Sequence, residues 1–280
     1  MLLKLFTIFL VAISFILPQE RLGTSDNYIT EIAKKYGDAI VLIEVKMKGK
    51  SVSKQGSGVL VNDGKIIITN FHVVAGSKEV KITFNDNTET FVDRYLRADE
   101  VRDLVSIKLP KRHKVSNSVT IKTSDDVKIG EKVVAIGNPL GLTTTVSEGI
   151  ISSKRNLGYE TVVLQTTAPI SHGSSGGGLF NSNGDLIGIT TFSFKNSQNL
   201  NFAVPGEYLF PLLKNGRTMP FLNLPLDNLY TNNNTDYETV YVTKTGKKFH
   251  KIGCRYTKNS SVPTNINEAI ISYAPCKICY

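Results

Sequence analysis

The sequence predicts an all-β protein with a small, separate module at its C-terminal end. From residue 39 to about residue 204, short apolar runs rich in Val, Ile and Thr alternate with turns that contain Gly, Asn and Asp. This spacing is typical of a β-sandwich or of β-barrels, and no long helical pattern interrupts it as a parallel α/β sheet would require. The chain has 280 residues and is 41% hydrophobic, which indicates a globular protein with a substantial core and excludes a disordered one.

The first 20 residues predict export. One lysine precedes an apolar run from Leu5 to Leu17, which is shorter than a membrane-spanning helix and fits the central region of a signal peptide. The run is not followed by a clean small-residue cleavage site, so a short uncleaved membrane anchor is the alternative. Both interpretations place the protein in the periplasm, in the extracellular space, or anchored at the outer face of a membrane.

Two short helices are expected to flank the strands. Apolar residues recur at intervals of three and four over residues 27–36, which predicts a helix with Asp26 or Asn27 as its N-cap. A second short helix is expected over residues 206–214. Between them, "NDG" at 62–64 and "NSNGD" at 181–185 predict hairpin turns. The expected strands include "AIVLIEV", "GSGVLV", "KIIITN", "EVKITF", "DLVSIKL", "EKVVAIG", "TVVLQTT", "LIGITTF" and "NFAVP".

The stretch "PISHGSSGGGLF", residues 169–180, is either a flexible loop or the site of a nucleophilic serine. Clusters of Gly and Ser are usually turns, but this one leads directly into an apolar strand. Glycines beside a serine also allow backbone N–H groups to converge on one point, as an oxyanion hole requires. A base and a carboxylate elsewhere in the chain would favour the catalytic interpretation.

His72 and Asp103 are the candidate base and carboxylate. His72 follows the strand-like "KIIIT", so it is expected at a strand end on a rigid element, although a lone histidine there is more often a core residue. Asp103 opens the apolar stretch "DLVSIKL", which predicts a buried carboxylate able to orient the histidine; a solvated strand-end Asp is the alternative. With Ser175, the order His72, Asp103, Ser175 matches one of the known orders of catalytic triads.

These residues and their surroundings resemble the trypsin-like serine proteases of the HtrA/Deg type. The similar stretches span about residues 39–205 and include "GSGVLVNDGKIIITNFHVV", "DLVSIKL", "AIGNPLGLTTTVSEGIIS" and "LQTTAPISHGSSGGGLFNSNGDLIGITT". The resemblance implies the chymotrypsin-like fold, two six-stranded antiparallel β-barrels with the active site in the cleft between them. It also implies His72 as general base, Asp103 as orienting carboxylate and Ser175 as nucleophile. The N–H groups of Gly173 and Ser175 would form the oxyanion hole.

The loop around the expected nucleophile departs from the family's pattern at three positions. Ser174 stands where the family usually has Asn, Gly178 where it usually has Pro, and His172 where Pro is common. None of these changes replaces a reacting atom. An added glycine loosens a loop, so we expect an oxyanion hole that is only partly preformed.

The resemblance also implies a substrate class. Ile170, Thr190, Thr191 and Phe192 would line the pocket for the substrate side chain that precedes the scissile bond. No acidic residue maps to the base of this pocket, so a small apolar side chain is expected rather than Lys or Arg. The implied activity is endopeptidase cleavage of unfolded or misfolded proteins through an acyl-enzyme, without a catalytic cofactor. The alternative is a non-catalytic, chaperone-like or surface-binding protein of the same fold.

The resemblance further implies how the chain is organised. The protease domain is expected over residues 21–215, followed by a polar linker over residues 216–237. HtrA-type relatives are often trimers assembled through their N-terminal segment, which makes a homotrimer an expectation, although this segment is short here. No stretch resembling a PDZ domain follows, so regulation through that peptide-sensing module is not expected.

Residues 238–280 predict a small zinc-binding module. His250 and Cys254 are spaced as H-x3-C, and Cys276 and Cys279 as C-x2-C. Three thiols and one imidazole complete a tetrahedral zinc site. A module this short has too small a core to fold without such a cross-link. A disulfide with one free thiol is the alternative, favoured by export but disfavoured by the odd number of thiols. The stretch also resembles small Ada-type metal-binding modules, which supports structural zinc.

Most of the net charge of +9 lies in this module. Between residues 240 and 280, seven Lys or Arg residues stand against one acid, Glu268, a difference of +6. Such a module would bind an anionic surface, whether cell-wall polymer, membrane or nucleic acid. Two alternatives stay open: a merely soluble module, or a module that is the main functional part and uses the barrels as a scaffold.

Overall fold

The computed structural model describes two regions of the chain. The larger region comprises residues 27–46, 53–138, 144–156, 161–171, 173–193 and 200–224. The smaller one comprises residues 239–243, 246–251, 253–257, 261–265, 269, 273–276 and 278–279. The expected signal peptide or anchor lies outside the described residues. Among the residues that are described, no helix has the length and apolar character needed to span a bilayer.

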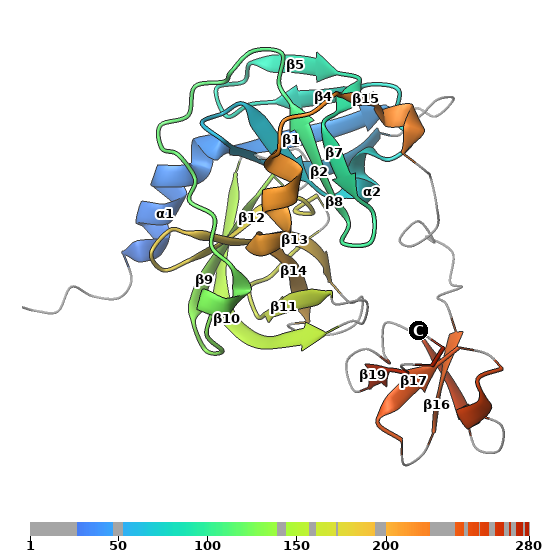
Figure 1. Ribbon diagram of the computed structural model, residues 1–280. Helices are drawn as coiled ribbons and strands as arrows, with labels where there is room; N and C mark the ends of the chain where they lie inside the picture. The colour runs from blue at the N-terminus through green and yellow to red at the C-terminus, as the bar shows by residue number, and fades with distance from the viewer. Residues whose placement is uncertain are drawn as a thin grey trace, which may run out of the picture.

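The first half of the larger region is a seven-stranded antiparallel sheet in the order β5-β4-β1-β2-β3-β8-β7 (Figure 1). Its helical elements are α1 (Tyr28–Tyr36), η1 (Gly37–Ala39) and the single turn α2 (Phe71–Val74). Its strands are β1 (Ile40–Lys46), β2 (Ser53–Val61), β3 (Ile66–Thr69), β4 (Val80–Thr83), β5 (Glu89–Val92), β7 (Arg97–Asp99) and β8 (Leu104–Lys108).

The second half is a closed six-stranded antiparallel barrel in the order β10-β11-β14-β13-β12-β9. Its strands are β9 (Lys132–Gly137), β10 (Thr145–Asn156), β11 (Val162–Thr166), β12 (Gly178–Asn181), β13 (Leu186–Ser193) and β14 (Asn201–Pro205), with η2 (Ser124–Asp126) before them. The all-β, chymotrypsin-like prediction is therefore confirmed. The first half is a half-barrel, because its seven-stranded sheet is not closed within the described residues. A separate two-stranded sheet pairs β6 (Arg94–Tyr95) with β15 (Met219–Pro220).

The alternation of side chains along the strands builds a shared core between the two halves. In β3, Ile67 faces the core of the first sheet, while Ile66 and Ile68 face the second half. There they pack in one buried cluster with Phe180 and Ile136. This cluster fixes the two halves against each other, which is the condition for a site assembled from both.

The short helices follow the sequence prediction in position but differ in detail. Helix α1 begins after Asn27, whose side chain bonds Glu31 (2.9 Å) and caps no backbone N–H. Tyr36 at its end is buried and stacks on Phe180, with ring centroids 5.1 Å apart. The helix expected over residues 206–214 is a 3₁₀-helix, η4 (Gly206–Leu213), because Pro211 removes a donor that an α-helix would need.

The first residues of the expected linker contact the first sheet. Residues 219–224 return to the first sheet through β15 and η5 (Phe221–Asn223), and Phe221 is fully buried in its core. The Phe221 N–H donates to the carbonyl of Asp93 (3.0 Å). The apolar side chain of Phe221 therefore attaches this segment to the first sheet.

The smaller region is a four-stranded sheet in the order β18-β16-β17-β19. It consists of β16 (Thr239–Thr243), β17 (Lys248–His250), η6 (Arg255–Thr257), β18 (Ser261–Asn265) and β19 (Ala274–Pro275). Four residues, Val240, Val242, Phe249 and Ala269, form its buried cluster. The helix-like stretch from Ile266 to Tyr273 lies largely outside the described residues.

Candidate active site

Three separate segments bring His72, Asp103 and Ser175 together. His72 lies in α2 directly after β3, Asp103 lies in the turn between β7 and β8, and Ser175 lies in the loop between β11 and β12. The last segment belongs to the second half of the domain and the first two to the first half. These three residues therefore lie where the two halves meet.

Asp103 receives hydrogen bonds from both the ring and the backbone of His72. Its Oδ2 lies 2.7 Å from His72 Nδ1, and its Oδ1 accepts from the His72 N–H at 2.9 Å. A carboxylate accepts only, so Nδ1 carries the ring proton and Nε2 is left with the lone pair. A histidine that acts as general base must have this tautomer, because Nε2 then has a free lone pair to accept a proton from the nucleophile.

The backbone of Asp103 is also fixed to the segment that carries His72. Its φ is +55°, a left-handed conformation that Asp and Asn tolerate better than other residues with side chains. Its carbonyl accepts hydrogen bonds from the Phe71 N–H (3.1 Å) and the Asn70 side chain (2.9 Å). The Asp103 carboxylate is buried, with 4% of its side chain exposed, against 28% for the His72 side chain.

Thr191 contacts both Asp103 and Ser175. Its hydroxyl donates to Asp103 Oδ2 at 2.8 Å, so three donors point at the carboxylate. Its carbonyl accepts the hydroxyl of Ser175 at 2.7 Å. A serine has one hydroxyl proton, so in this structure Ser175 donates it to Thr191 rather than to His72. A rotation about χ1 of Ser175 redirects that proton.

The loop before Ser175 offers two backbone N–H groups. Within the described part of the chain, no hydrogen bond occupies the N–H of Gly173 or that of Ser175. Gly173 has φ +92° and Gly176 has φ +89°. A Cβ at Gly176 would lie 2.1 Å from the carbonyl oxygen of Ser57, so only glycine allows this close approach.

The structure describes two of the three positions at which this loop departs from the family's pattern. Gly178 begins β12 and pairs with Ile136 and Ile189 on its two sides, so it lies in a strand and does not lengthen the loop. A Cβ there would meet the ring of Phe180 at 2.5 Å. Ser174 bonds Ser171, through its N–H (3.0 Å) and its hydroxyl (3.4 Å). His172 lies outside the described residues.

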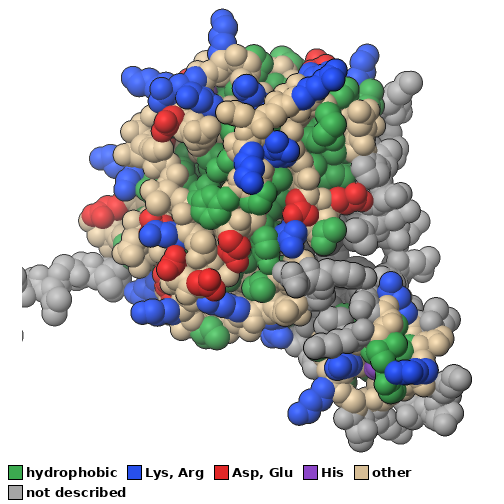
Figure 2. Space-filling model, viewed as in Figure 1, with side chains coloured by type: hydrophobic (Ala, Val, Ile, Leu, Met, Phe, Trp, Pro, Cys, Tyr) green, Lys and Arg blue, Asp and Glu red, His purple; other side chains and the backbone are tan. Residues whose placement is uncertain are grey.

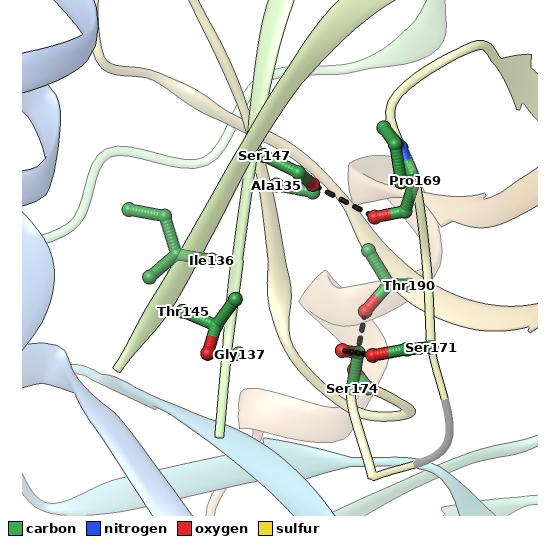
Figure 3. Close-up of a pocket in the computed structure, with 9 residues that line it drawn as sticks. All are labelled: Ala135, Ile136, Gly137, Thr145, Ser147, Pro169, Ser171, Ser174 and Thr190. Atoms are coloured by element: carbon green, nitrogen blue, oxygen red, sulfur yellow. Dashed lines mark hydrogen bonds between the residues drawn. The ribbon is translucent and has the colours of Figure 1, made fainter. Parts of the chain in front are cut away.

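The residues expected to contact the substrate lie in different settings. Thr190 and Thr191 are each 2% exposed, and the Thr190 hydroxyl donates to the carbonyl of Ser174 at 2.7 Å (Figure 3). Their side chains serve the triad and its loop, so substrate contact through these two residues would involve their backbone. Ile170 is half-buried, and the side chain of Phe192 lies outside the description.

A small cavity lies behind the loop, between it and strands β9 and β10. Its polar wall consists of hydroxyls, and Ser147 donates to the carbonyl of Pro169 at 2.7 Å (Figure 3). The residues that line it are Ala135, Ile136, Gly137, Thr145, Ser147, Pro169, Ser171, Ser174 and Thr190. Two of its lining residues, Ser147 and Thr190, bond carbonyls of the loop.

The four expected metal ligands converge in the smaller region. The candidate ligand atoms of His250, Cys254, Cys276 and Cys279 all lie within 4.8 Å of one another, and the three thiols are free. His250 Nδ1 lies 3.3 Å from the sulfur of Cys254 and 4.0 Å from that of Cys279. The donor set, three sulfurs and one nitrogen, fits a structural zinc ion.

The backbone near these ligands also contacts a sulfur, and the surroundings shift the pKa values of His250 and Cys279. The Lys251 N–H donates to the sulfur of Cys279 at 3.4 Å. Burial and the charge of Lys248 lower the pKa of His250, which keeps the imidazole neutral as a ligand must be. Burial raises the pKa of Cys279 to about 11, so a bound metal has to displace its proton.

Comparisons with known proteins agree with this geometry. The sequence model of the trypsin-like peptidase domain matches residues 56–189. A protein from Synechocystis sp. named as the serine protease HhoA is 32% identical over 206 residues, 68% of this chain and 52% of the relative. A protein from Rickettsia prowazekii named as a DegP-like periplasmic serine endoprotease is 33% identical over 198 residues, 67% of this chain and 38% of the relative.

A solved structure is similar as well. The HtrA-type protease AlgW with a tripeptide matches with a TM-score of 0.58 and 31% identity, over 65% of this chain and 60% of that one. The chain spans about half or less of the length of the two curated relatives. Together, these similarities support an HtrA-type trypsin-like serine protease domain.

Proposed function

We propose that this chain, with its trypsin-like peptidase domain and its HtrA-type relatives, is a serine endopeptidase that cleaves unfolded or misfolded proteins through an acyl-enzyme. The observation that carries the proposal is the pairing of Asp103 with His72 beside Ser175, in a domain whose relatives are serine proteases. This constellation identifies a nucleophile, a base and an orienting carboxylate by their contacts.

In the proposed reaction, Ser175 Oγ attacks the scissile carbonyl while His72 Nε2 takes its proton. Asp103 stabilises the imidazolium that forms, through the 2.7 Å contact with Nδ1. The N–H groups of Gly173 and Ser175 receive the developing oxyanion. The imidazolium then gives its proton to the leaving amine, and water hydrolyses the acyl-enzyme by the same steps in reverse.

One observation favours the alternative, a non-catalytic chaperone-like or surface-binding protein of the same fold. The Ser175 hydroxyl donates to the carbonyl of Thr191, so the resting orientation is not the attacking one. Catalytic hydrogen bonds are often formed only when substrate binds, so this geometry is compatible with an enzyme. The two proposals differ in whether Ser175 reacts.

Reactivity of Ser175 tests the proposal. We expect the protein to hydrolyse casein and to lose this activity as a fluorophosphonate labels one site, which peptide mass mapping assigns to Ser175. The matched control is the Ser174→Ala variant, which should be labelled at the same site because, among the described residues, the Ser174 hydroxyl bonds the hydroxyl of Ser171 and no base. Folded protein that neither cleaves casein nor takes up the label would favour the binding alternative.

The substrate preference, the oligomeric state and the export of the protein are further parts of the proposal. We propose a preference for a small apolar side chain before the scissile bond, because the candidate pocket residues Ile170, Thr190, Thr191 and Phe192 include no acid. A homotrimer is proposed on the resemblance alone. Export is supported by the apolar run near the N-terminus and by the DegP-like relative, which is named as periplasmic.

For the smaller region we propose a structural zinc site and an anionic partner surface. His250, Cys254, Cys276 and Cys279 would hold the zinc ion. Figure 2 shows Lys and Arg side chains on the visible face of this region, with no acidic side chain among the residues drawn in colour there. The described basic residues Lys247, Lys248, Lys251 and Arg255 are all exposed.

Salt-dependent retention on a polyanion tests the anionic partner. We expect the Lys247→Ala/Lys248→Ala variant to elute from a heparin resin at lower salt than the unchanged protein. With two fewer cationic side chains, the variant releases fewer counterions when it binds the polyanion. The control is Lys108→Ala/Lys111→Ala, which removes the same charge from exposed positions in and just after β8 of the first sheet. Equal elution of the two variants would contradict a tether formed by the smaller region.

A further inference from the structure

Ser57 is a fully buried serine that lies where the first sheet meets the loop carrying Ser175. It belongs to β2, and its exposed fraction is 0%. The sequence offers no sign of its importance, because "GSGVLV" reads as an ordinary apolar strand with small residues. Its contacts show that it belongs to the surroundings of the active site.

Every polar atom of Ser57 is hydrogen-bonded. Its hydroxyl donates to the carbonyl of Gly173 (2.7 Å) and accepts from the Asn138 N–H at the end of β9 (2.8 Å). Its N–H donates to the carbonyl of Ser175 (2.7 Å). Its carbonyl accepts the hydroxyl of Thr69 (2.6 Å). One residue of the first sheet therefore binds the two residues of the second half that supply the oxyanion hole.

These bonds determine the direction of the loop's peptide groups. The carbonyl and N–H of a trans peptide point in opposite directions, and the described chain has no cis peptide bond. With the Gly173 carbonyl directed at Ser57, the Ser174 N–H points away and reaches the Ser171 carbonyl (3.0 Å). Likewise, the Ser174 carbonyl is held by Thr190, which directs the Ser175 N–H to the opposite side.

The hydroxyl of Ser57 has a role that its backbone cannot take. Gly173, at φ +92°, has no side chain to restrict it, so its orientation depends on bonds from outside the loop. The only described partner of the Gly173 carbonyl is this hydroxyl. The space for the hydroxyl is kept by Gly137, where a Cβ would lie 3.1 Å from Ser57 Oγ.

We propose that Ser57 is a positioning residue that fixes the 173–174 peptide, which lies between the two oxyanion donors, and so keeps the Gly173 and Ser175 N–H groups in place. The inference rests on the proposed function, since an oxyanion forms only if Ser175 attacks a carbonyl. Ser57 acts through the loop and does not touch the substrate. It couples the first sheet to the catalytic loop of the barrel, so both halves are needed for a preformed oxyanion hole.

The test is the Ser57→Ala variant, compared with Ser106→Ala. Ser106 is an equally buried serine whose hydroxyl donates to the Leu212 carbonyl (2.8 Å), away from the catalytic loop. We expect Ser57→Ala to lower kcat on a peptide substrate about 10- to 100-fold, with KM changed less than about threefold, because a misplaced oxyanion donor weakens transition-state binding only. Ser106→Ala should leave both constants close to those of the unchanged protein.

Amide hydrogen exchange supplies a readout that does not require activity. We expect faster exchange in peptides covering residues 171–178 for Ser57→Ala, and unchanged exchange there for Ser106→Ala. A kcat within about threefold of the unchanged protein, or an equal fall in both variants, would overturn the inference. If the unchanged protein is itself inactive, the proposed function fails. Unchanged exchange in the Ser57→Ala loop would then overturn the positioning role as well.

Discussion

The Asp103→Asn variant should lose about four orders of magnitude in kcat while keeping its fold. Such a loss is typical when the carboxylate of a serine-protease triad becomes an amide. Here the contacts explain why neither orientation of the amide works. An NH2 group in place of Oδ2 would face the Nδ1 proton of His72, which is 2.7 Å away. An NH2 group in place of Oδ1 would face the His72 N–H at 2.9 Å.

The first orientation is satisfied only if the proton moves from Nδ1 to Nε2 of His72. The imidazole then accepts from the amide, but its Nε2 no longer has the lone pair that takes the proton of Ser175. Stability should change little, because Asn tolerates the φ of +55° and leaves the carbonyl contacts to Asn70 and Phe71 intact.

The measurement is kcat on a peptide substrate, with thermal unfolding as the check on the fold. Asp99→Asn is the matched control, because Asp99 lies four residues away and, within the described part of the chain, its carboxylate bonds only Arg102 (3.0 and 2.9 Å). We expect that variant to keep nearly all of its kcat. A kcat for Asp103→Asn within tenfold of the unchanged protein would show that Asp103 is not the orienting carboxylate.

Local patterns in the sequence were sufficient to predict the strands and to propose His72 and Asp103 as members of a triad. The "NDG" turn between β2 and β3 places Asn62, Asp63 and Gly64 at positive φ, as such hairpin turns require. His72 and Asp103 were recognisable because each stands at the edge of an apolar strand. These signals lie within a few residues of the position that they describe.

Contacts between distant segments could not be predicted in this way. Ser57 bonds Gly173 across 116 residues of sequence, and Thr191 bonds Asp103 across 88. Which hydroxyl meets which carbonyl depends on the register of the strands and on the packing of the two halves, and neither leaves a local pattern. The burial of Phe221 escaped prediction for the same reason, since the residues that it packs against belong to the first sheet and lie far away in the sequence.

Removing zinc should unfold the smaller region and leave the barrels folded. Its buried apolar cluster contains only Val240, Val242, Phe249 and Ala269 among the described residues. So small a core does not offset the conformational entropy of the segment, whereas a structural zinc ion contributes roughly 10–16 kcal/mol to small modules of this kind. The barrels contain none of the four candidate ligands, so their stability should not depend on the metal.

The experiment compares the zinc-loaded protein with the same protein after treatment with a chelator. We expect one zinc ion per chain by elemental analysis, and hydrogen exchange that accelerates in residues 239–279 alone when zinc is removed. Casein hydrolysis should persist. Cys276→Ser should reproduce the effect of the chelator, because Cys276 is buried among the ligands, whereas Lys247→Ala at an exposed position should not.

The pH dependence of zinc binding distinguishes a thiolate site from a disulfide. Without metal, the pKa of Cys279 is raised to about 11, so zinc has to displace a proton from this thiol near neutral pH. Affinity should therefore rise by at least about tenfold per pH unit as the pH increases from 6 to 8, with release of protons on binding. A protein that binds no zinc after reduction, or whose mass shows two thiols already joined, would contradict the site. The smaller region would then depend on a disulfide for its fold.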